Sequence, residues 1–472
     1  MAENTRELVL DTLLTLEREK TFSHSLVKAV LDKYDYLDGR DKAFYKRVAE
    51  GTLERQIELD YYLNHFSNVP VKKMKPLIRC LLRMSVYQLL YMDAVPDSAV
   101  CNEACKLALK RKFQNLRGYV NGVLRNVARN KENLPLPDKS KDLLQYLSVK
   151  YSMPMWLVEL WHDRYGAGIT EEMLSGLMQV HPVSLRFSTK LSATEREQWC
   201  EQMRARGAEL AQNMYLPYVY LMQNGEGLNT MPGFAEGIYL VQDVSSALAV
   251  EAAGITPTDF VVDVCAAPGG KSILASEKAA KVLSRDVSEE KTTIIKENLH
   301  RMQCTNVEVQ VYDGSQQDVS LAGKADVVLL DVPCSGLGII GKKRDIKYNA
   351  SPEGIAELNA LQKEIVRASA GYVKSGGILM YSTCTIHKSE NEDMVRFISE
   401  ELGFEPVSLK ECIPDTVWSA KERIAEAMAI VGKDTSSGLS KMQQDACVQL
   451  LPGFMESDGF FMAKFRNNKK HE

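Results

Sequence analysis

The C-terminal half of the chain alternates strand-like and helix-like segments, and this alternation restricts the possible folds more than any other feature. Short apolar runs typical of buried strands occupy 260–265, 282–287, 307–315, 325–330 and 377–380. Helical patterns occupy 288–302, 353–373 and 388–402, and residues 458–466 alternate like an antiparallel strand. Strands separated by helices usually form a parallel sheet. We therefore predict an α/β domain over 241–472, with one antiparallel strand near its end.

The first strand of this domain runs into a glycine turn, FVVDVCAAPGGKS at Phe260–Ser272. Gly269 and Gly270 let the backbone turn sharply and approach a ligand closely. A helix is expected to start at about Lys271 and to reach about Ala280, and its free N–H groups suit a polar or anionic ligand. The spacing matches neither the dinucleotide fingerprint nor the P-loop. By itself the turn indicates only a βα connection.

Two later segments each place a cysteine just after a predicted strand. DVPCSGLG at 331–338 and YSTCT at 381–385 both follow one of the apolar runs. In open α/β sheets, ligands bind outside the carboxyl ends of the strands. The glycine turn and the segments that carry Cys334 and Cys384 are therefore expected to meet in one crevice.

The motifs CAAPGGK, DVPC and STCT, in this order, resemble those of the RNA 5-methylcytosine methyltransferases of the Sun/Fmu/NOL family. The resemblance covers nearly the whole chain. It implies a Rossmann-like class I methyltransferase domain that uses S-adenosylmethionine. It also implies methyl transfer to carbon 5 of a cytosine in small-subunit (16S) ribosomal RNA, through a covalent bond between a cysteine and carbon 6.

Carbon 5 of cytosine is a poor nucleophile, and a thiolate added at carbon 6 activates it. The Pro-Cys cysteine is the nucleophile in DNA cytosine methyltransferases, whereas the Thr-Cys cysteine is the nucleophile in this RNA family. The resemblance therefore implies that Cys384 is the nucleophile and that Cys334 assists product release. It also implies that Asp331 holds nitrogen 3 and the exocyclic amine, with Lys271 near the reacting centre. For either cysteine alone, a small apolar residue at a strand end is a reasonable alternative.

Acidic residues at the ends of the second and third strands are candidates for binding the cofactor. Asp286 can accept hydrogen bonds from both ribose hydroxyls, and Asp313 can accept one from the adenine amino group. Isolated aspartates at such places are more often caps or turn residues. The turn backbone would hold the methionine portion, while the Cys265 side chain is expected to pack. The full predicted cofactor set is Cys265, Ala266, Ala267, Pro268, Gly269, Gly270, Lys271, Asp286, Asp313 and Asp331.

The pattern of residues 1–130 predicts an all-helical region, and Pro76 is expected to start one of its helices. The segments at 81–108 and 119–125 look like the NusB-type RNA-binding bundle that precedes the catalytic part in members of the family. Cys101 and Cys105 share a helix face and are expected to pack. The basic residues Lys110, Arg111, Lys112 and Arg117 are candidates for phosphate contacts, and surface charge on a helix pair is an equally good interpretation.

Residues 131–145 are polar at their start, contain two prolines before 140 and are predicted to form a linker. Residues 146–240 predict a small α+β unit that resembles the RRM-like element of the family. Arg186 stands in that element's R-[VF]-N motif, with Ser188 in place of the asparagine. Helices are expected at 154–165 and 193–207, and strands at 183–189 and in two segments before residue 243.

The segment GLGIIGKKRDIKY at 336–348 resembles a family segment that usually carries Arg-Arg-His-Pro before Asp-Ile-Lys-Trp. Lys342, Lys343 and Arg344 keep most of the charge, but the His-Pro is lost and Tyr348 replaces the tryptophan. Lysine does not reproduce the bidentate grip of arginine, so substrate contacts here are expected to differ.

Four aromatic residues are compatible with base contacts or with core packing. Trp156 and Trp161 are candidates for stacking on bases, although packing is the simpler interpretation. Phe460 and Phe461 fit the wall of a base pocket or the core equally well.

The net charge of −4 gives no overall attraction to nucleic acid, so an RNA site must be local. Four basic clusters qualify, although each alone is more often a solvated face: Lys72–Lys75, Lys110–Arg117, Lys342–Lys347 and Lys464–Lys470. The ten cysteines form no C-x₂-C pair, so no metal site is expected. Without a membrane span or a leader pattern, we expect a cytoplasmic, monomeric protein whose partner is small-subunit ribosomal RNA, with no membrane or DNA partner.

Two other classes of function remain open at this point. A non-catalytic RNA-binding factor for ribosome assembly or antitermination would use only the N-terminal bundle, and the intact set Cys334, Cys384, Asp286 and Asp313 argues against it. A small-molecule methyltransferase would have no use for residues 1–130.

Overall fold

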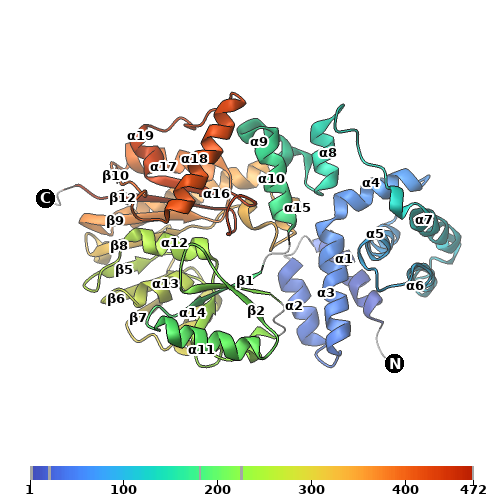
Figure 1. Ribbon diagram of the computed structural model, residues 1–472, viewed down its shortest axis with the longest axis horizontal. Coiled ribbons are helices and arrows are strands. Elements are labelled where there is room, and N and C mark those ends of the chain that lie inside the picture. The colour runs from blue at the N-terminus through green and yellow to red at the C-terminus, as the bar shows by residue number, and fades with distance from the viewer. Residues whose placement is uncertain (1–3, 20–22, 180–181, 224–226, 470–472) are drawn as a thin grey trace. The chain divides into compact units, whose positions relative to one another are not determined.

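The computed structural model describes residues 4–19, 23–179, 182–223 and 227–469, and Figure 1 shows their helices and strands. The backbone forms two compact units. The first, the helical unit, is Met1–Met178 with Lys342–Asn349, and the second, the sheet unit, is Gln179–Gly341 with Ala350–Glu472. The predicted domain boundaries near 130, 145 and 240 describe a finer division and stay predictions.

The helical unit confirms the all-helical N-terminal region. Its core contains Leu10 of α1 and Leu81 and Val86 of α5, all fully buried. α5 starts at Pro76, where a missing N–H costs nothing because the first helical turn leaves it unpaired. The helices are α1 (Thr5–Glu19), α2 (Ser23–Lys33), α3 (Gly39–Glu54), α4 (Gln56–Phe66), α5 (Pro76–Tyr91), α6 (Asp97–Lys110), α7 (Arg117–Arg129), α8 (Leu143–Lys150), α9 (Met155–Tyr165), α10 (Ala167–Met178) and α15 (Ile346–Asn349).

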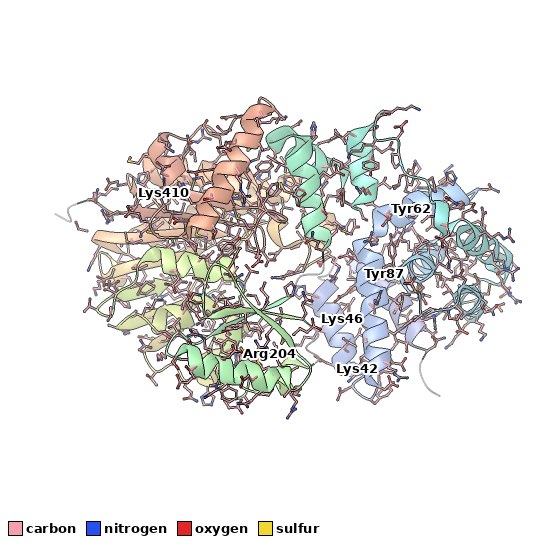
Figure 2. The ribbon with its side chains drawn as sticks, viewed as in Figure 1. Lys42, Lys46, Tyr62, Tyr87, Arg204 and Lys410 are labelled. Carbon is pink, nitrogen blue, oxygen red and sulfur yellow. The ribbon has the colours of Figure 1, made fainter. Side chains whose placement is uncertain are left out.

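Helices α3 and α5 approach each other closely at a glycine. A β-carbon at Gly51 of α3 would lie 2.1 Å from the ring of Tyr87 on α5. A larger residue at this position would therefore push the two helices apart. Figure 2 labels Tyr87, together with Lys42 and Lys46 nearer the start of α3.

Two cysteines and Trp161 of this unit are buried, whereas Trp156 is half-buried. Cys101 and Cys105 are buried on α6, as predicted from their spacing. Trp161 of α9 is fully buried, which excludes it from stacking on a base. α10 is not among the predicted helices, although Ile169, Met173 and Leu177 recur at helical spacing on its buried face.

Residues Lys342–Asn349 interrupt the sequence of the sheet unit but pack within the helical unit. Arg344 forms ion pairs with Glu50 (3.0 Å) and Glu54 (2.9 Å) of α3. The Tyr348 hydroxyl donates to Leu53 O (2.9 Å). The basic cluster Lys342–Lys347 was a candidate for RNA contact. Two of its four cations form contacts within the protein, and the other two, Lys342 and Lys343, are exposed.

Lys347 is the most unusual residue of this segment. Its side chain is 1% exposed, and Nζ donates to Glu54 O (2.6 Å) and Ser152 O (2.7 Å). Burial lowers the pKa of Lys347 to about 7, whereas an unfolded lysine titrates near pH ~10.4. Between these values the unfolded chain binds the extra proton, so the free energy of unfolding rises with pH. At lower pH both states hold the proton and this dependence disappears.

We expect Lys347→Met to remove this pH dependence. Urea unfolding of the wild type and the variant from pH 7 to 9.5 should give free energies that diverge by up to about 1.4 kcal/mol per pH unit. The exposed Lys343→Met is the matched control and should follow the wild type. Parallel profiles for wild type and Lys347→Met would contradict the expectation.

A small antiparallel sheet with one helix forms the start of the sheet unit, which confirms the predicted α+β element. The strands pair in the order β2-β3-β1-β4. Their core includes Leu185, Phe187, Tyr220 and Tyr239. The elements are β1 (Val183–Phe187), α11 (Ala193–Arg204), β2 (Glu209–Gln212), β3 (Val219–Gln223) and β4 (Tyr239–Val241).

Arg186 of β1 is fully buried and holds the small sheet to the helix after the glycine turn. Its Nε donates to Gln242 Oε1 (2.6 Å), and Nη1 donates to Glu277 Oε1 (3.2 Å). Glu277 Oε2 also accepts from the N–H (2.8 Å) and the hydroxyl (2.6 Å) of Thr189. In contrast, the Ser188 hydroxyl accepts from the nearby Lys190 N (3.3 Å), while Ser188 N donates to Ile238 O (3.1 Å).

Replacing Arg186 by methionine is expected to destabilise the protein by about 3–5 kcal/mol, because the buried Glu277 carboxylate would lose its countercharge. Urea unfolding of the variant measures this loss. Arg204→Met is the control, since the Arg204–Glu197 pair is at the surface and is worth at most about 1 kcal/mol. A loss for Arg186→Met no larger than for Arg204→Met would show that the buried pair is dispensable.

The large sheet has the predicted parallel core with antiparallel strands at one side. Its order is β10-β12-β9-β8-β5-β6-β7, with β11 paired to β12. The pairs among β5 to β9 are parallel, and β12 lies antiparallel to β9. The strands are β5 (Phe260–Asp263), β6 (Lys281–Asp286), β7 (Val307–Val311), β8 (Ala325–Asp331), β9 (Val373–Thr383), β10 (Glu405–Pro406), β11 (Cys447–Leu450) and β12 (Phe460–Arg466).

The helices of this domain follow the predicted order, with several differences in length. α13 ends at Ser276 rather than near 280, because the chain must turn before β6 begins at Lys281. The predicted helix 388–402 is divided into a 3₁₀ turn, α17 and one π-helical turn. Residues 405–450 contain the strands β10 and β11 and two helices. The helices are α12 (Val244–Ala253), α13 (Gly270–Ser276), α14 (Glu289–Arg301), α16 (Pro352–Ala370), α17 (Glu392–Arg396), α18 (Asp415–Ile430) and α19 (Lys441–Asp445).

None of the helices within the described ranges has the length and apolar character needed to cross a membrane.

Candidate active site

The three predicted site segments follow the carboxyl ends of β9, β8 and β5, which are consecutive neighbours in the sheet. From β5 the chain builds the sheet to one side through β6 and β7, and then to the other side through β8 and β9. This reversal is the switch point at which open α/β sheets bind ligands.

The two strand-end cysteines meet, although they are 50 residues apart in the chain. Parallel pairing of β8 with β9 places Asp331 opposite Ser382, so Cys334 and Cys384 follow from adjacent strand ends. Their Sγ atoms are 3.3 Å apart, and both residues are free thiols. The hydrogen bond to Cys384, together with burial, raises the pKa of Cys334. Cys334 therefore keeps its proton more firmly than an ordinary thiol.

Glu390 supports the loop that carries Cys334, and it is fully buried. Its carboxylate accepts from the N–H of Ser335 (2.9 Å), from the Ser335 hydroxyl and from Gln362 Nε2 (2.9 Å). Gln362 also donates to Pro333 O (2.9 Å). Burial raises the pKa of Glu390. Glu390 is absent from the predicted site, because an acidic run such as KSENED usually indicates a solvated face.

Asp331 and Lys271 form the ion pair of the site. Lys271 Nζ donates to Asp331 Oδ2 (2.7 Å) and to Ser246 Oγ (3.0 Å), and Asp331 Oδ1 accepts from Ser382 Oγ (2.8 Å). Lys271 is 8% exposed. Both oxygens of Asp331 are thus held in place, so the carboxylate has a fixed orientation. Ser246 and Ser382 are absent from the predicted site, although Ser382 is the first residue of the STCT motif.

Asp286 connects the end of β6 to the glycine turn. Its Oδ2 accepts from Ala267 N (3.0 Å), and its Oδ1 accepts from Val287 N (2.8 Å) and lies 3.0 Å from Lys291 Nζ. Asp313 lies two residues beyond the end of β7, not at the strand end as predicted. It is exposed, and hydrogen bonds from Ser315 lower the pKa of Asp313.

Two buried polar atoms beside the glycine turn suit a polar ligand. Asp263 Oδ1 and Gln242 Nε2 are buried and have no hydrogen-bond partner among the described residues. Burial raises the pKa of Asp263 to about 7, despite the hydrogen bond from Ser272 Oγ (2.6 Å). At Gly270, a β-carbon would lie 3.2 Å from Gln242 Cδ, so the glycine lets the Gln242 side chain pack closely against the turn. Buried polar atoms normally have partners, and a bound ligand would supply them.

The remaining residues that the sequence singled out have packing roles. Burial raises the pKa of Cys265, which suits a packed thiol rather than a reactive one. Phe461 is in the core of the large sheet. Phe460 is also buried, and its ring lies under Lys271 Nζ at 5.4 Å, beside the ion pair.

The basic clusters differ in the exposure of their cations and in the ion pairs that these cations form. Lys110 and Arg111 form ion pairs with Glu7, and Lys464 is 8% exposed and donates to Cys412 Sγ (3.4 Å). Lys470, the end of that cluster, lies outside the described residues. Lys72 and Lys73 are exposed.

Two family models match the chain. Residues 252–466 match the model described as "16S rRNA methyltransferase RsmB/F", and residues 3–129 match the NusB family. Curated relatives extend over almost the full length. A "Probable ribosomal RNA small subunit methyltransferase B" of Bacillus subtilis is 32% identical over 98% of both chains. The protein of the same name from Synechocystis is 30% identical over 98% of this chain and 99% of its own.

Solved structures support the fold. The crystal structure of PH0851 has a TM-score of 0.75 at 24% identity, covering 99% of this chain and 100% of its own. A methyltransferase homolog protein from Pyrococcus horikoshii has a TM-score of 0.55 at 20% identity, covering 69% of this chain and 99% of its own.

Proposed function

Because this chain belongs to the family of ribosomal RNA small subunit methyltransferases B, and is therefore a methyltransferase, we propose that it methylates carbon 5 of a cytosine in small-subunit (16S) ribosomal RNA, with S-adenosylmethionine as the methyl donor. The observation that carries the proposal is the pair of free thiols 3.3 Å apart beside the Asp331–Lys271 ion pair. Methylation of a ring nitrogen or a ribose hydroxyl needs no thiol, whereas carbon 5 of cytosine needs one to be activated.

In this proposal Cys384 is the nucleophile. Its Sγ, as the thiolate, adds to carbon 6, which makes carbon 5 electron-rich. This assignment follows the Thr-Cys motif of the family, and Cys334 stands in the Pro-Cys motif beside it. After methylation, carbon 5 gives up its proton to solvent, the electrons of that C–H bond re-form the carbon 5–carbon 6 double bond, and the carbon 6–sulfur bond breaks with its electron pair leaving on Cys384. Cys334 assists this release. The thiolate of Cys384 is then restored.

Asp331 holds the base in the proposed mechanism. Its carboxylate would contact nitrogen 3 and the exocyclic amine, while Ser382 and Lys271 keep it oriented. Lys271 is the cation nearest the reacting centre. To reach this crevice the cytosine must leave its stack, which costs least in a loop of the RNA.

The cofactor would be held by the glycine turn and by the acids at the ends of β6 and β7. Bound there, S-adenosylmethionine supplies an electrophilic methyl group. Asp286 would accept from the ribose hydroxyls, Asp313 from the adenine amino group, and the backbone of Cys265–Gly270 would face the methionine portion. The unpartnered Asp263 Oδ1 and Gln242 Nε2 support this placement.

The proposed RNA partner follows from the names of the relatives and from the NusB match over residues 3–129. We retain neither alternative function. A non-catalytic assembly factor does not agree with relatives that are methyltransferases, and a small-molecule enzyme leaves residues 3–129 without a role.

The test is to incubate the protein with labelled S-adenosylmethionine and small-subunit ribosomal RNA that lacks the modification, and then to digest the RNA to nucleosides. We expect all transferred label in 5-methylcytidine. Label in another nucleoside would refute the carbon 5 assignment, and a protein that binds the RNA but transfers no label would refute the activity on this substrate.

A further inference from the structure

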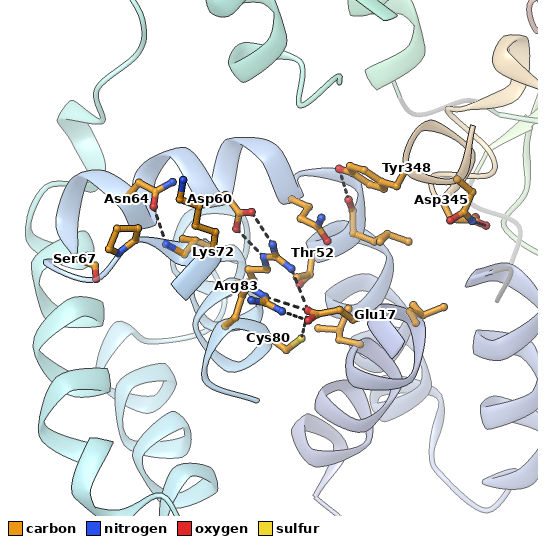
Figure 3. A pocket seen from close by; sticks show the side chains of 18 of the residues that line it. Glu17, Thr52, Asp60, Asn64, Ser67, Lys72, Cys80, Arg83, Asp345 and Tyr348 are labelled. Carbon is orange, nitrogen blue, oxygen red and sulfur yellow. Dashed lines mark hydrogen bonds and ion pairs between the residues drawn. The ribbon is translucent and has the colours of Figure 1, made fainter. Parts of the chain in front are cut away.

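The helical unit contains a cavity that none of the proposed catalytic or cofactor residues lines. Its volume is about 950 Å³, and it is bordered by α1, α3, α4, α5 and residues Asp345, Tyr348 and Asn349 (Figure 3). We call it the bundle cavity. Ligand pockets in proteins usually measure about 300–1,000 Å³, so one nucleotide fits within it.

Four charged side chains inside the bundle cavity form ion pairs, and the Asp345 carboxylate accepts a hydrogen bond from Ser23 Oγ (2.5 Å). Arg83 lies between Asp60 and Glu17 in Figure 3 and donates to both Asp60 oxygens (2.7 and 2.6 Å), with Glu17 at 3.5 Å. Arg79 pairs with Glu17. A ligand that brought its own charge into the interior would leave a countercharge unpaired, which is costly away from water. The interior therefore suits a neutral ligand.

Several polar groups of the wall are available to such a ligand. Thr52 is 2% exposed, and its hydroxyl has no hydrogen-bond partner among the described residues. The side-chain amide of Gln56 also lines the cavity and presents a donor and an acceptor. Asn349 lines it too, with its Nδ2 donating to Asp345 Oδ2 (3.5 Å), so its amide oxygen is the atom that it presents. The edge of a nucleobase presents the same combination, so an unpaired base would satisfy these groups.

Other side chains that line the bundle cavity are aromatic or apolar. Tyr348 lines the cavity with its hydroxyl fixed on Leu53 O (2.9 Å), so the ring is held in place. Leu13 and Leu16 line it from α1. Aromatic and apolar side chains are the usual partners of the faces of unstacked bases.

Positive charge lies where the cavity opens. Lys72 lines the cavity and is exposed, and the neighbouring Lys73 is exposed as well. Lysines at such a rim can contact a phosphate while the base lies inside.

We propose that the bundle cavity binds one unpaired nucleotide of the substrate RNA, with the base inside and its phosphate against Lys72 and Lys73. The identity of that RNA rests on the proposed function. The nucleotide would be a recognition point on the RNA, separate in sequence from the cytosine that is methylated.

The test measures equilibrium binding of unmodified small-subunit ribosomal RNA by the full-length chain without a methyl donor, over a range of salt concentrations. Gln56→Leu removes a base contact and is expected to weaken binding about tenfold without changing the salt dependence. Lys72→Ala removes a phosphate contact and is expected to lower the slope of log K against log salt by about 1. Lys46→Ala is the control, since Lys46 is exposed on α3 and does not line the cavity.

A second measurement locates the RNA. RNA carrying 4-thiouridine should crosslink on irradiation to the peptide that spans residues 52–72, and Gln56→Leu should reduce this crosslink. Wild-type affinity in both variants, or crosslinks elsewhere only, would overturn the proposal. So would saturable binding of cytidine monophosphate with unchanged RNA affinity in the variants, which would assign the cavity to a free nucleotide. Because no methyl donor is present, absence of methyl transfer would refute the proposed function without affecting this result.

Discussion

Replacing Cys384 by alanine is expected to abolish methyl transfer, and replacing Cys334 by alanine is expected to trap the protein on its RNA. The two thiols lie 3.3 Å apart, so neither can be assigned a role from its position alone. The motifs separate them, because Cys384 stands in the Thr-Cys motif that carries the nucleophile in the RNA family that this chain resembles. The hydrogen bond to Cys384 and burial raise the pKa of Cys334.

The two variants should therefore fail in different ways. Without Cys384 no bond to carbon 6 forms, so label transfer to RNA should fall below detection. Without Cys334 the bond forms but is released slowly, so a protein–RNA adduct should survive denaturing gel electrophoresis. Cys412→Ala, in the same unit and outside the proposed site, should behave as the wild type.

The opposite pattern would reverse the assignment. If Cys384→Ala formed the adduct and Cys334→Ala formed none, Cys334 would be the nucleophile. If both variants kept full activity, the covalent mechanism would be wrong, although the protein would remain a methyltransferase.

Asp331→Asn is expected to lower kcat by about 10²–10⁴-fold. The amide keeps the shape of the side chain, but it turns one acceptor oxygen into a donor. Asp331 now accepts from Ser382 Oγ and Lys271 Nζ. One of these donors would face an NH₂ group, and the base would lose the negative charge beside nitrogen 3.

This prediction is checked with single-turnover rates at saturating RNA, together with the dissociation constant for S-adenosylmethionine. We expect the rate to fall while the thermal unfolding midpoint changes little. Asp326→Asn is a matched control on the same strand, since Asp326 pairs with Lys374 and the N–H of Phe260 away from the site. A rate for Asp331→Asn within threefold of the wild type would exclude its role in holding the base.

Much of the site follows from local patterns in the sequence. The apolar runs predict the strands, and parallel pairing brings their carboxyl ends to one edge of the sheet. That reasoning is enough to place Lys271, Asp331, Cys334 and Cys384 together. It needs no knowledge of the loops between them.

Buried charges are what the sequence does not reveal. Glu390 lies in an acidic run, and its burial depends on Ser335 and Gln362, which are 55 and 28 residues away. Lys347 lies in a basic run, and its partners Glu54 and Ser152 are 293 and 195 residues away. Local composition predicts a solvated residue in both cases, and only the tertiary fold supplies the partners that make burial possible.

The packing of Lys342–Asn349 within the helical unit limits how the protein can be divided. The chain passes between the two units three times, at 178–179, 341–342 and 349–350. A fragment that ends at Met178 would lack Arg344, Lys347 and Tyr348, and a chain without the N-terminal helices would leave the same three side chains with no surface to pack on. Inactivity of such a truncated protein would then report a misfolded segment eight residues after Cys334, rather than a missing RNA contact. Point substitutions in the intact chain are the better way to separate recognition from chemistry in this enzyme.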